Sequence, residues 1–343
     1  MAAQSPSTAL NIIEALRSST HLRAQEAPPK VVALGGGHGL YGSLSALRHV
    51  TTDLTAVVTV ADDGGSSGRL RNDFGVVPPG DLRMALSALC DDTDWGRTWR
   101  DVMQHRFEST RPESSMALDN HALGNLLIVS LWQLLGDTVA GLDWAGALLN
   151  ARGRVLPMSC VPLVIEGDAQ TSADPEDHNV EHVVGQANLA KAYRVDNVRI
   201  TPEDAPATPE AVESILEADW VILGPGSWYT SVLPHLLLPG IRDALLTTTA
   251  KICVVMNLEL EDRETRGLSA SDHLEILRKY APDFRLNAVI ADPAGMGRCE
   301  ALEETARRMG AQVTWVQVRN SENENVHDPL KLGAAYETVF RFG

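Results

Sequence analysis

The feature that most constrains the fold is a glycine-rich segment placed directly after a short apolar run. Residues 31–34 (VVAL) have the composition of a buried strand, residues 35–42 read GGGHGLYG, and the helix-like SLSALRHV follows. The same order returns at 220–231, where WVIL is followed by GPGSWYTS. A strand, a glycine turn and a helix in succession are typical of open α/β sheets.

Further apolar runs support the same fold class. They occupy residues 54–60, 251–257, 286–292 and 312–318, and helix-like stretches separate most of them. Thr208 before Pro209 is a helix start signal, as is Ser271 with Asp272. Near-continuous apolar strands alternating with helices predict a Rossmann-like, doubly wound, mostly parallel sheet with helices on both faces.

The domain organisation follows from where this pattern starts. Residues 1–29 contain a short amphipathic piece and end in two prolines, and we expect them to form a flexible N-terminal extension. Residues 30–343 are predicted to form one α/β domain, with helices over about 120–153. Around 155–195 the pattern becomes less regular, which indicates an insertion.

Charge and hydropathy exclude several function classes. The 343 residues hold 29 Lys and Arg against 45 Asp and Glu, so the net charge is −16. That excess argues against a broad nucleic-acid surface, which needs basic residues. No stretch approaches the ~20 apolar residues of a membrane span, and the first residues lack a signal-peptide pattern. We therefore expect a cytoplasmic protein with no nucleic-acid partner and no membrane insertion.

The first glycine-rich turn predicts phosphate binding. Gly37, His38 and Gly39 begin a GxGxxG match that ends at Gly42, and Gly36 precedes it. Glycine lets the backbone approach a phosphate closely, and the following helix points N–H groups at the anion. The alternative is a tight strand-to-helix turn that binds nothing.

Two adjacent carboxylates follow the second predicted strand. Asp62 and Asp63 open the segment DDGGSSGR, which also contains Ser66. Either carboxylate could bind a sugar or ribose hydroxyl, coordinate Mg²⁺ or cap the next helix. Two carboxylates are too few to establish a metal site, so all three roles remain open.

Two further motifs supply polar candidates near these loops. In PPGDLR, Asp81 is predicted to be the N-cap of a helix, and Arg83 is a cation close to the phosphate turn. In HALGN, His121 and Asn125 are expected on one face of the first turn of an apolar helix. Ligand contact and structural hydrogen bonding are both open for this pair.

The second glycine-rich turn predicts another anion site. Gly224, Gly226, Ser227, Tyr229 and Thr230 follow the strand at 220–223. Two such turns at the carboxyl edge of one sheet could hold a diphosphate between them. The segment contains no G-x-S-x-G elbow, and we predict no catalytic residue.

Taken in order, GGGHGL, TVADDGGSSGRLR, PPGDLR, HALGNLL and GPGSWYTSVLP resemble the YvcK/CofD-like family, specifically its YvcK (gluconeogenesis factor) branch. The resemblance runs from about residue 30 to 339 and includes HDPLKL. It implies a Rossmann-like fold, a homo-oligomer and binding of UDP-N-acetylglucosamine or UDP-glucose. It also implies a role in gluconeogenic growth, carbon partitioning to cell-wall precursors and cell shape, through protein partners that the sequence does not identify. The family pattern keeps Asn257, Glu264 and Thr265, whereas His38 replaces a threonine.

Three functions therefore compete. The first is a UDP-sugar-binding regulator that requires no cofactor, with Mg²⁺ accompanying a diphosphate ligand as an option. In it, the backbone of Gly36–Gly39 and Gly226–Thr230 would cradle the diphosphate, and Asn125 and Arg83 would complete the pocket. The second, implied by the CofD branch, is an Mg²⁺-dependent transferase that moves 2-phospho-L-lactate or phosphoenolpyruvate to a deazaflavin. The third, an NAD-dependent oxidoreductase, rests only on the glycine fingerprint and an acidic residue.

Overall fold

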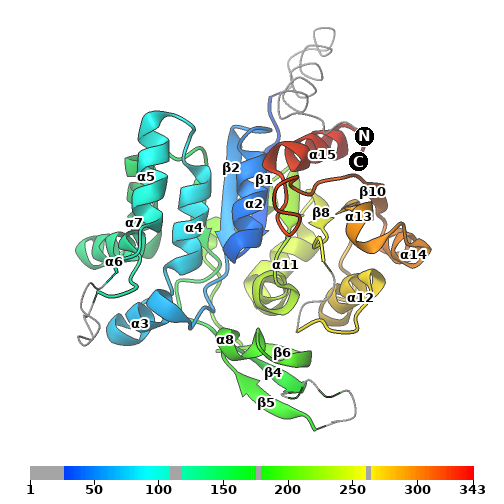
Figure 1. Ribbon diagram of the computed structural model, residues 1–343, viewed down its shortest axis with the longest axis horizontal. Coiled ribbons are helices and arrows are strands. Elements are labelled where there is room, and N and C mark those ends of the chain that lie inside the picture. Colours follow the sequence, from blue (N-terminus) through cyan, green and yellow to red (C-terminus); the bar gives the residue numbers. More distant parts are fainter. Residues whose placement is uncertain (1–26, 109–117, 171, 173, 175–178, 260–263) are drawn as a thin grey trace.

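The computed structural model contains a large parallel sheet and a small antiparallel one (Figure 1). It describes residues 27–108, 118–170, 172, 174, 179–259 and 264–343. The 7-stranded sheet has the order β10-β9-β8-β7-β1-β2-β3. Its strands are β1 (Lys30–Gly35), β2 (Asp53–Val58), β3 (Arg154–Pro157), β7 (Trp220–Leu223), β8 (Lys251–Val255), β9 (Ala288–Ala291) and β10 (Gln312–Trp315). All neighbouring pairs in this sheet are parallel, as the sequence predicts.

Helices connect the strands. They are α2 (Gly37–Leu47), α3 (Gly65–Phe74), α4 (Gly80–Leu89), α5 (Asp94–Gln104), α6 (Leu123–Leu135), α7 (Thr138–Leu149), α8 (Gln186–Leu189), α9 (Pro209–Glu217), the π-helix η1 (Trp228–Val232), α10 (Pro234–Leu237), α11 (Pro239–Thr247), α12 (Ala270–Tyr280), α13 (Pro293–Met296), α14 (Glu300–Arg308) and α15 (Pro329–Phe342). None of the helices in the described part of the chain is long and apolar enough to cross a bilayer.

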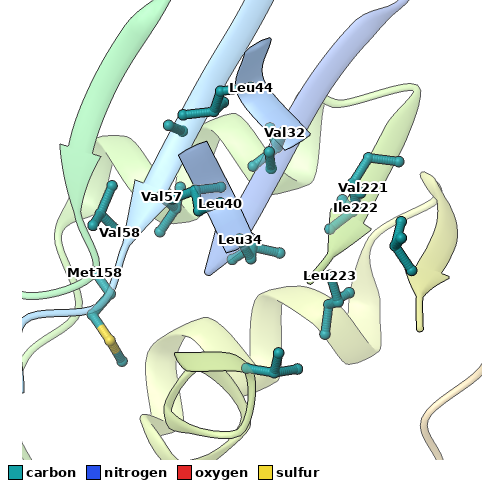
Figure 2. Packing of buried hydrophobic residues seen from close by; sticks show 14 of the residues in the cluster. Val32, Leu34, Leu40, Leu44, Val57, Val58, Met158, Val221, Ile222 and Leu223 are labelled. Carbon is teal, nitrogen blue, oxygen red and sulfur yellow. The ribbon is translucent and has the colours of Figure 1, made fainter. Parts of the chain in front are cut away.

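The core lies between the strands and the helices on both sides of them. Strand residues such as Val32, Val57 and Ile222 are almost fully buried. Figure 2 shows Leu40 and Leu44 of α2 in front of β1 and β2, with further helices behind the strands. Burial on both faces explains why these strands are continuously apolar rather than alternating.

The strand order contains a switch point between β1 and β7. From β1 the chain moves outward to β2 and β3, and later it returns to the other side of β1 and continues through β7, β8, β9 and β10. In open α/β sheets ligands bind outside the carboxyl ends of the strands at such a point. Both glycine-rich turns follow the two strands that flank it.

The insertion is more regular than the sequence indicates. Residues 155–157 belong to β3 of the large sheet, and the described residues that follow, up to 201, include the three strands of an antiparallel sheet in the order β5-β4-β6. Its strands are β4 (Val164–Gln170), β5 (Glu181–Val184) and β6 (Tyr193–Thr201). Figure 1 shows this sheet below the carboxyl ends of the large one. The sequence obscures it because two register shifts interrupt the pairing of β4 with β6.

Helix starts agree with the sequence at one position and differ at two. Pro209 is the first residue of α9, as predicted. In α12 the N-cap is Ser269, which forms a capping box with Asp272, so Ser271 lies inside the helix. In α4 the N-cap is Pro79, and Asp81 lies within the first turn, so its prediction as N-cap was wrong. Most of the N-terminal extension, residues 1–26, lies outside the described residues.

Candidate functional site: a cleft between two glycine-rich turns

A cleft of about 560 Å³ lies at the switch point. Turns and loops from distant parts of the chain form its walls, together with α2 and η1. Its lining residues are Gly36, Gly37, His38, Gly39, Gly42, Gln186, Pro225, Gly226, Ser227, Thr230, Ser231, Asn257, Leu258, Glu259, Asn325, Val326 and His327. Seven of the predicted binding residues belong to this set: Gly36, Gly37, His38, Gly39, Gly226, Ser227 and Thr230.

The N-terminus of α2 opens onto this cleft. Its N-cap, Gly36, has an extended backbone and provides no side-chain cap. Leu40 donates the first backbone hydrogen bond of the helix, to the Gly36 carbonyl at 3.3 Å. The N–H groups before it have no partner within the helix, and the helix dipole adds partial positive charge at the same place. One of them, the Gly37 N–H, donates to the buried Asp81 carboxyl, so the others remain for a ligand. This end of the cleft suits an anion.

Close packing explains why the two turns contain glycine. A Cβ at Gly39 would lie 2.1 Å from the Pro225 carbonyl oxygen and 2.6 Å from the Cα of Gly226. A Cβ at Gly36 would lie 2.5 Å from both Asp81 Oδ2 and Thr59 Cγ2. The glycines therefore bring the two turns into contact and keep the backbone accessible from the cleft.

The second turn uses most of its backbone donors internally. The Asn257 side chain accepts from the Gly226 N–H and donates to the Gly226 carbonyl, both at 2.9 Å. Thr230 N–H donates to Ser227 Oγ at 3.2 Å. Ser227 Oγ in turn donates to Glu264 Oε1 at 2.6 Å. The N–H groups of Gly226, Tyr229 and Thr230 all have partners within the protein, which does not support the prediction that Gly226–Thr230 offers a row of free backbone N–H groups.

Two predicted residues of this turn do not line the cleft. Tyr229 lines a separate cavity of about 550 Å³, together with Glu264. Burial raises the pKa of its phenol. Gly224 adopts a positive φ of 74° beneath the turn, where a Cβ would lie 3.0 Å from the Val255 carbonyl oxygen.

Asp62 and Asp63 both lie outside the cleft and stabilise the neighbouring loops. Asp62 Oδ1 accepts from the Gly64 N–H at 2.9 Å, and burial raises the pKa of this carboxyl although the Gly64 hydrogen bond opposes the shift. Asp63 Oδ1 accepts from the Ala187 N–H at 2.9 Å. Asp63 therefore links the loop after β2 to α8 of the insertion, directly beside the cleft residue Gln186.

Ser66, His121 and Asn125 converge on one another. Ser66 Oγ lies 3.0 Å from His121 Nδ1 and accepts from Asn125 Nδ2 at 3.0 Å. All three residues are buried and none lines the cleft. His121 lies before the start of α6, whereas Asn125 belongs to its first turn. This geometry favours the structural hydrogen-bonding interpretation that the sequence left open.

Arg83 lies behind the first turn rather than in the cleft. Its guanidinium donates to Gln104, and burial together with nearby Arg106 lowers its pKa to about 10. Asp81 lies next to Gly36, and burial followed by the charge of Asp62 raises its pKa to about 7. Among the cleft-lining residues that the structure describes, none is lysine or arginine. Attraction for an anion therefore has to come from the α2 backbone.

Sequence reasoning did not assign several cleft residues to the site. Asn257, Leu258 and Glu259 directly follow β8, so the rule that ligands bind at carboxyl ends of strands could have identified them. Gln186 comes from the insertion. Asn325, Val326 and His327 precede α15, and only the HDPLKL motif at 327–332 pointed to that segment.

Comparison with known proteins identifies the family. A family model described as 2-phospho-L-lactate transferase CofD matches residues 31–327. The chain belongs to the CofD family. Within it, the chain is 47% identical over 318 residues to a putative gluconeogenesis factor of Mycobacterium leprae, covering 91% of this chain and 86% of that protein. It is 39% identical to the gluconeogenesis factor of Bacillus subtilis, covering 89% of this chain and 96% of that protein.

A solved structure supports the same assignment. A UPF0052 family protein from Bacillus halodurans superimposes with a TM-score of 0.78 at 31% sequence identity. The match covers 90% of this chain and 99% of that one. The chain is thus a member of the gluconeogenesis-factor (YvcK) branch of the CofD family, with the Rossmann-like fold that its sequence predicts.

The described residues do not form a resident metal site. No group of three or more His, Cys, Asp or Glu side chains among them could hold a metal ion. One oxygen of Asp62 and one of Asp63 already accept backbone hydrogen bonds, and neither residue lines the cleft. An Mg²⁺ ion carried by a diphosphate ligand stays a prediction.

Proposed function

We propose that this protein is a nucleotide-sugar-binding regulator that acts in gluconeogenic growth and in carbon partitioning to cell-wall precursors and cell shape. The observation that carries the proposal is the cleft at the switch point, with the N-terminus of α2, whose N-cap residue is a glycine, opening onto it. The names of its relatives in Mycobacterium leprae and Bacillus subtilis support the physiological part. As in the sequence-based hypothesis, the protein requires no cofactor and acts as a cytoplasmic homo-oligomer with protein partners that are not identified.

The shape and polarity of the cleft support a ligand with a central diphosphate. Gln186 of the insertion and Asn325 of the segment before α15 line the cleft together with the N-terminus of α2. Gln186 Oε1 is buried and has no hydrogen-bond partner among the described residues. An unpaired acceptor favours a ligand with hydroxyl or N–H donors, such as a sugar.

Isothermal titration calorimetry with UDP-N-acetylglucosamine and UDP-glucose tests the proposal. We expect saturable binding of at least one of them, and stronger binding than of inorganic pyrophosphate because the ends of the ligand contribute. A ligand at 100 times its dissociation constant should add about 2.7 kcal/mol of stability in a thermal melt. No heat with either sugar nucleotide at millimolar concentration would overturn the proposal.

A transferase of the CofD type is the second candidate, because the matching family model spans residues 31–327. It predicts Mg²⁺-dependent transfer of a phospholactyl-type group from a guanosine-diphosphate-activated donor to a deazaflavin. Replacing Asp63 by asparagine should abolish that turnover. Mass spectrometry that detects no product with the wild-type protein would remove this candidate. An NAD-dependent oxidoreductase gains no support from the residues around the cleft.

A further inference from the structure

The segment between β10 and α15 forms one wall of the cleft. Figure 1 shows it returning from the edge of the sheet towards α2. An isolated β-bridge pairs Arg319 with His327, and Lys331 Nζ donates to the Arg319 carbonyl at 2.7 Å. The Arg319 guanidinium also donates to the Leu258 carbonyl of the loop after β8. The segment is therefore fixed against the cleft, with Asn325, Val326 and His327 lining it.

His327 has one ring nitrogen without a partner. The residue is only 9% exposed, and its ring forms a hydrogen bond with the Met256 backbone. The other nitrogen, Nε2, is buried and has no hydrogen-bond partner among the described residues. Burial lowers the pKa of His327 to about 4, against the opposing effects of the Met256 bond and of Asp292, while Arg319 adds to the lowering. The ring is therefore neutral at pH 7, so with its N–H directed to Met256, Nε2 is a hydrogen-bond acceptor.

The surroundings of His327 suit a flat heterocycle. Leu258 is buried beside the cleft, and Val326 is 47% exposed. Both apolar residues line the cleft together with Asn325. An apolar slot with a few fixed polar groups is the usual environment of a bound ring system, because the polar groups orient what the apolar surface holds.

We propose that His327 Nε2 accepts a hydrogen bond from the nucleobase of the bound ligand and thereby selects bases whose pairing-edge ring nitrogen carries a hydrogen. Uracil has this N3–H donor, whereas cytosine has a lone pair at N3. Cytosine would therefore place two acceptors against each other in a buried position, which is costly because neither is then satisfied. The inference rests on the proposed nucleotide-sugar site and assigns His327 as its specificity-determining residue.

The test compares UDP with CDP, which differ at the pairing edge of the base. Calorimetric titration of the wild-type protein should give at least ~10-fold tighter binding of UDP, as expected for one buried hydrogen bond. His327→Phe keeps a ring but removes the acceptor, so the ratio of UDP affinity to CDP affinity should fall to near one. His327→Gln should bind UDP with an affinity within a few-fold of the wild type. It should also bind CDP more tightly than the wild type does, since the amide presents either an acceptor or a donor. Glu322→Gln, an exposed change in the same segment, is the matched control and should leave both affinities unchanged.

The outcomes separate this inference from the proposed function. If neither UDP nor UDP-N-acetylglucosamine binds the wild type, the proposed function fails and the inference fails with it. If UDP-N-acetylglucosamine binds but the wild type does not distinguish UDP from CDP, the inference alone fails. An unchanged UDP-to-CDP ratio in His327→Gln also overturns it, and this variant decides the matter if His327→Phe does not fold. If His327 were purely structural, replacing it would weaken the binding of UDP and CDP equally.

Discussion

The side-chain amide of Asn257 closes on the backbone of Gly226, accepting from its N–H and donating to its carbonyl at 2.9 Å each. The pair joins the loop after β8 to the turn after β7 and so holds two walls of the cleft together. The Asn257 amide thereby provides hydrogen-bond partners for both the N–H and the carbonyl of Gly226. Part of the site therefore depends on a residue that holds a neighbouring loop in place.

Asn257→Ala should weaken both the fold and ligand binding. Removing the amide leaves the Gly226 N–H and carbonyl unpaired, which costs about 1–3 kcal/mol in the free energy of unfolding. We expect binding of UDP-N-acetylglucosamine to weaken by ~10-fold because the turn is no longer fixed. Urea unfolding and calorimetry measure the two effects. Asn287→Ala, which removes a single hydrogen bond to Ile252 N–H outside the cleft, should leave affinity unchanged; equal affinity losses in the two variants would contradict this account.

Gly39→Ala and Gly42→Ala form a matched pair on α2. A Cβ at position 39 meets the Pro225 carbonyl oxygen at 2.1 Å, whereas one at position 42 meets nothing within 4 Å. The first change should cost about 1–3 kcal/mol and reduce ligand affinity because the two turns must separate. The second should stabilise the protein by about 0.5–1 kcal/mol through helix propensity. Thermal unfolding of both variants checks the opposite signs, and two destabilised variants would refute the packing argument.

The carboxyl of Asp81 predicts a pH dependence of stability. Its pKa is raised to about 7 in the folded protein, so the folded state binds a proton that the unfolded state has already released. The free energy of unfolding should therefore fall as the pH rises from about 4 to about 7. Relative to Asp81→Asn, the wild type should lose up to about 3 kcal/mol between pH ~5 and pH ~8. Urea titrations at both pH values measure this difference, and parallel pH profiles would rule out the effect.

The buried contact between Ser43 and Tyr336 predicts a non-additive double mutant. Ser43 Oγ and Tyr336 Oη lie 2.7 Å apart where α15 packs on α2. Tyr336→Phe leaves the serine hydroxyl unsatisfied and should cost about 1–3 kcal/mol, whereas adding Ser43→Ala should recover part of that loss. Chemical unfolding of the single and double variants completes the cycle. Strictly additive changes would show that the two hydroxyls do not interact.

Much of the fold could be predicted because the core strands are unusually apolar. Runs such as Val31–Leu34 and Trp220–Leu223 are buried on both faces, and each is followed by glycines, so composition alone indicates a parallel sheet. The small antiparallel sheet escaped prediction because β5 is short and largely exposed, and because β4 and β6 pair with register shifts.

The candidate site could be predicted only in part. The turn at Gly36–Gly39 was recognisable because its glycines directly follow an apolar strand in the sequence. Arg83 and Asn125 were predicted to complete the pocket, yet their side chains bond to Gln104 and Ser66. Gln186 and His327 reach the cleft only through tertiary packing of the insertion and of the segment before α15. The HDPLKL motif marks the segment around His327, but neither it nor the residues around Gln186 indicate which loop the segment packs against.

The two walls of the cleft lie far apart in the sequence, which has a consequence for biosynthesis. The first wall of the cleft, at Gly36–Gly39, leaves the ribosome long before the wall at 325–327 is translated. A nascent chain therefore exposes the glycine-rich turn before the opposite wall of the cleft exists. If the proposed function holds, a ligand would bind only chains that already include residues 325–327.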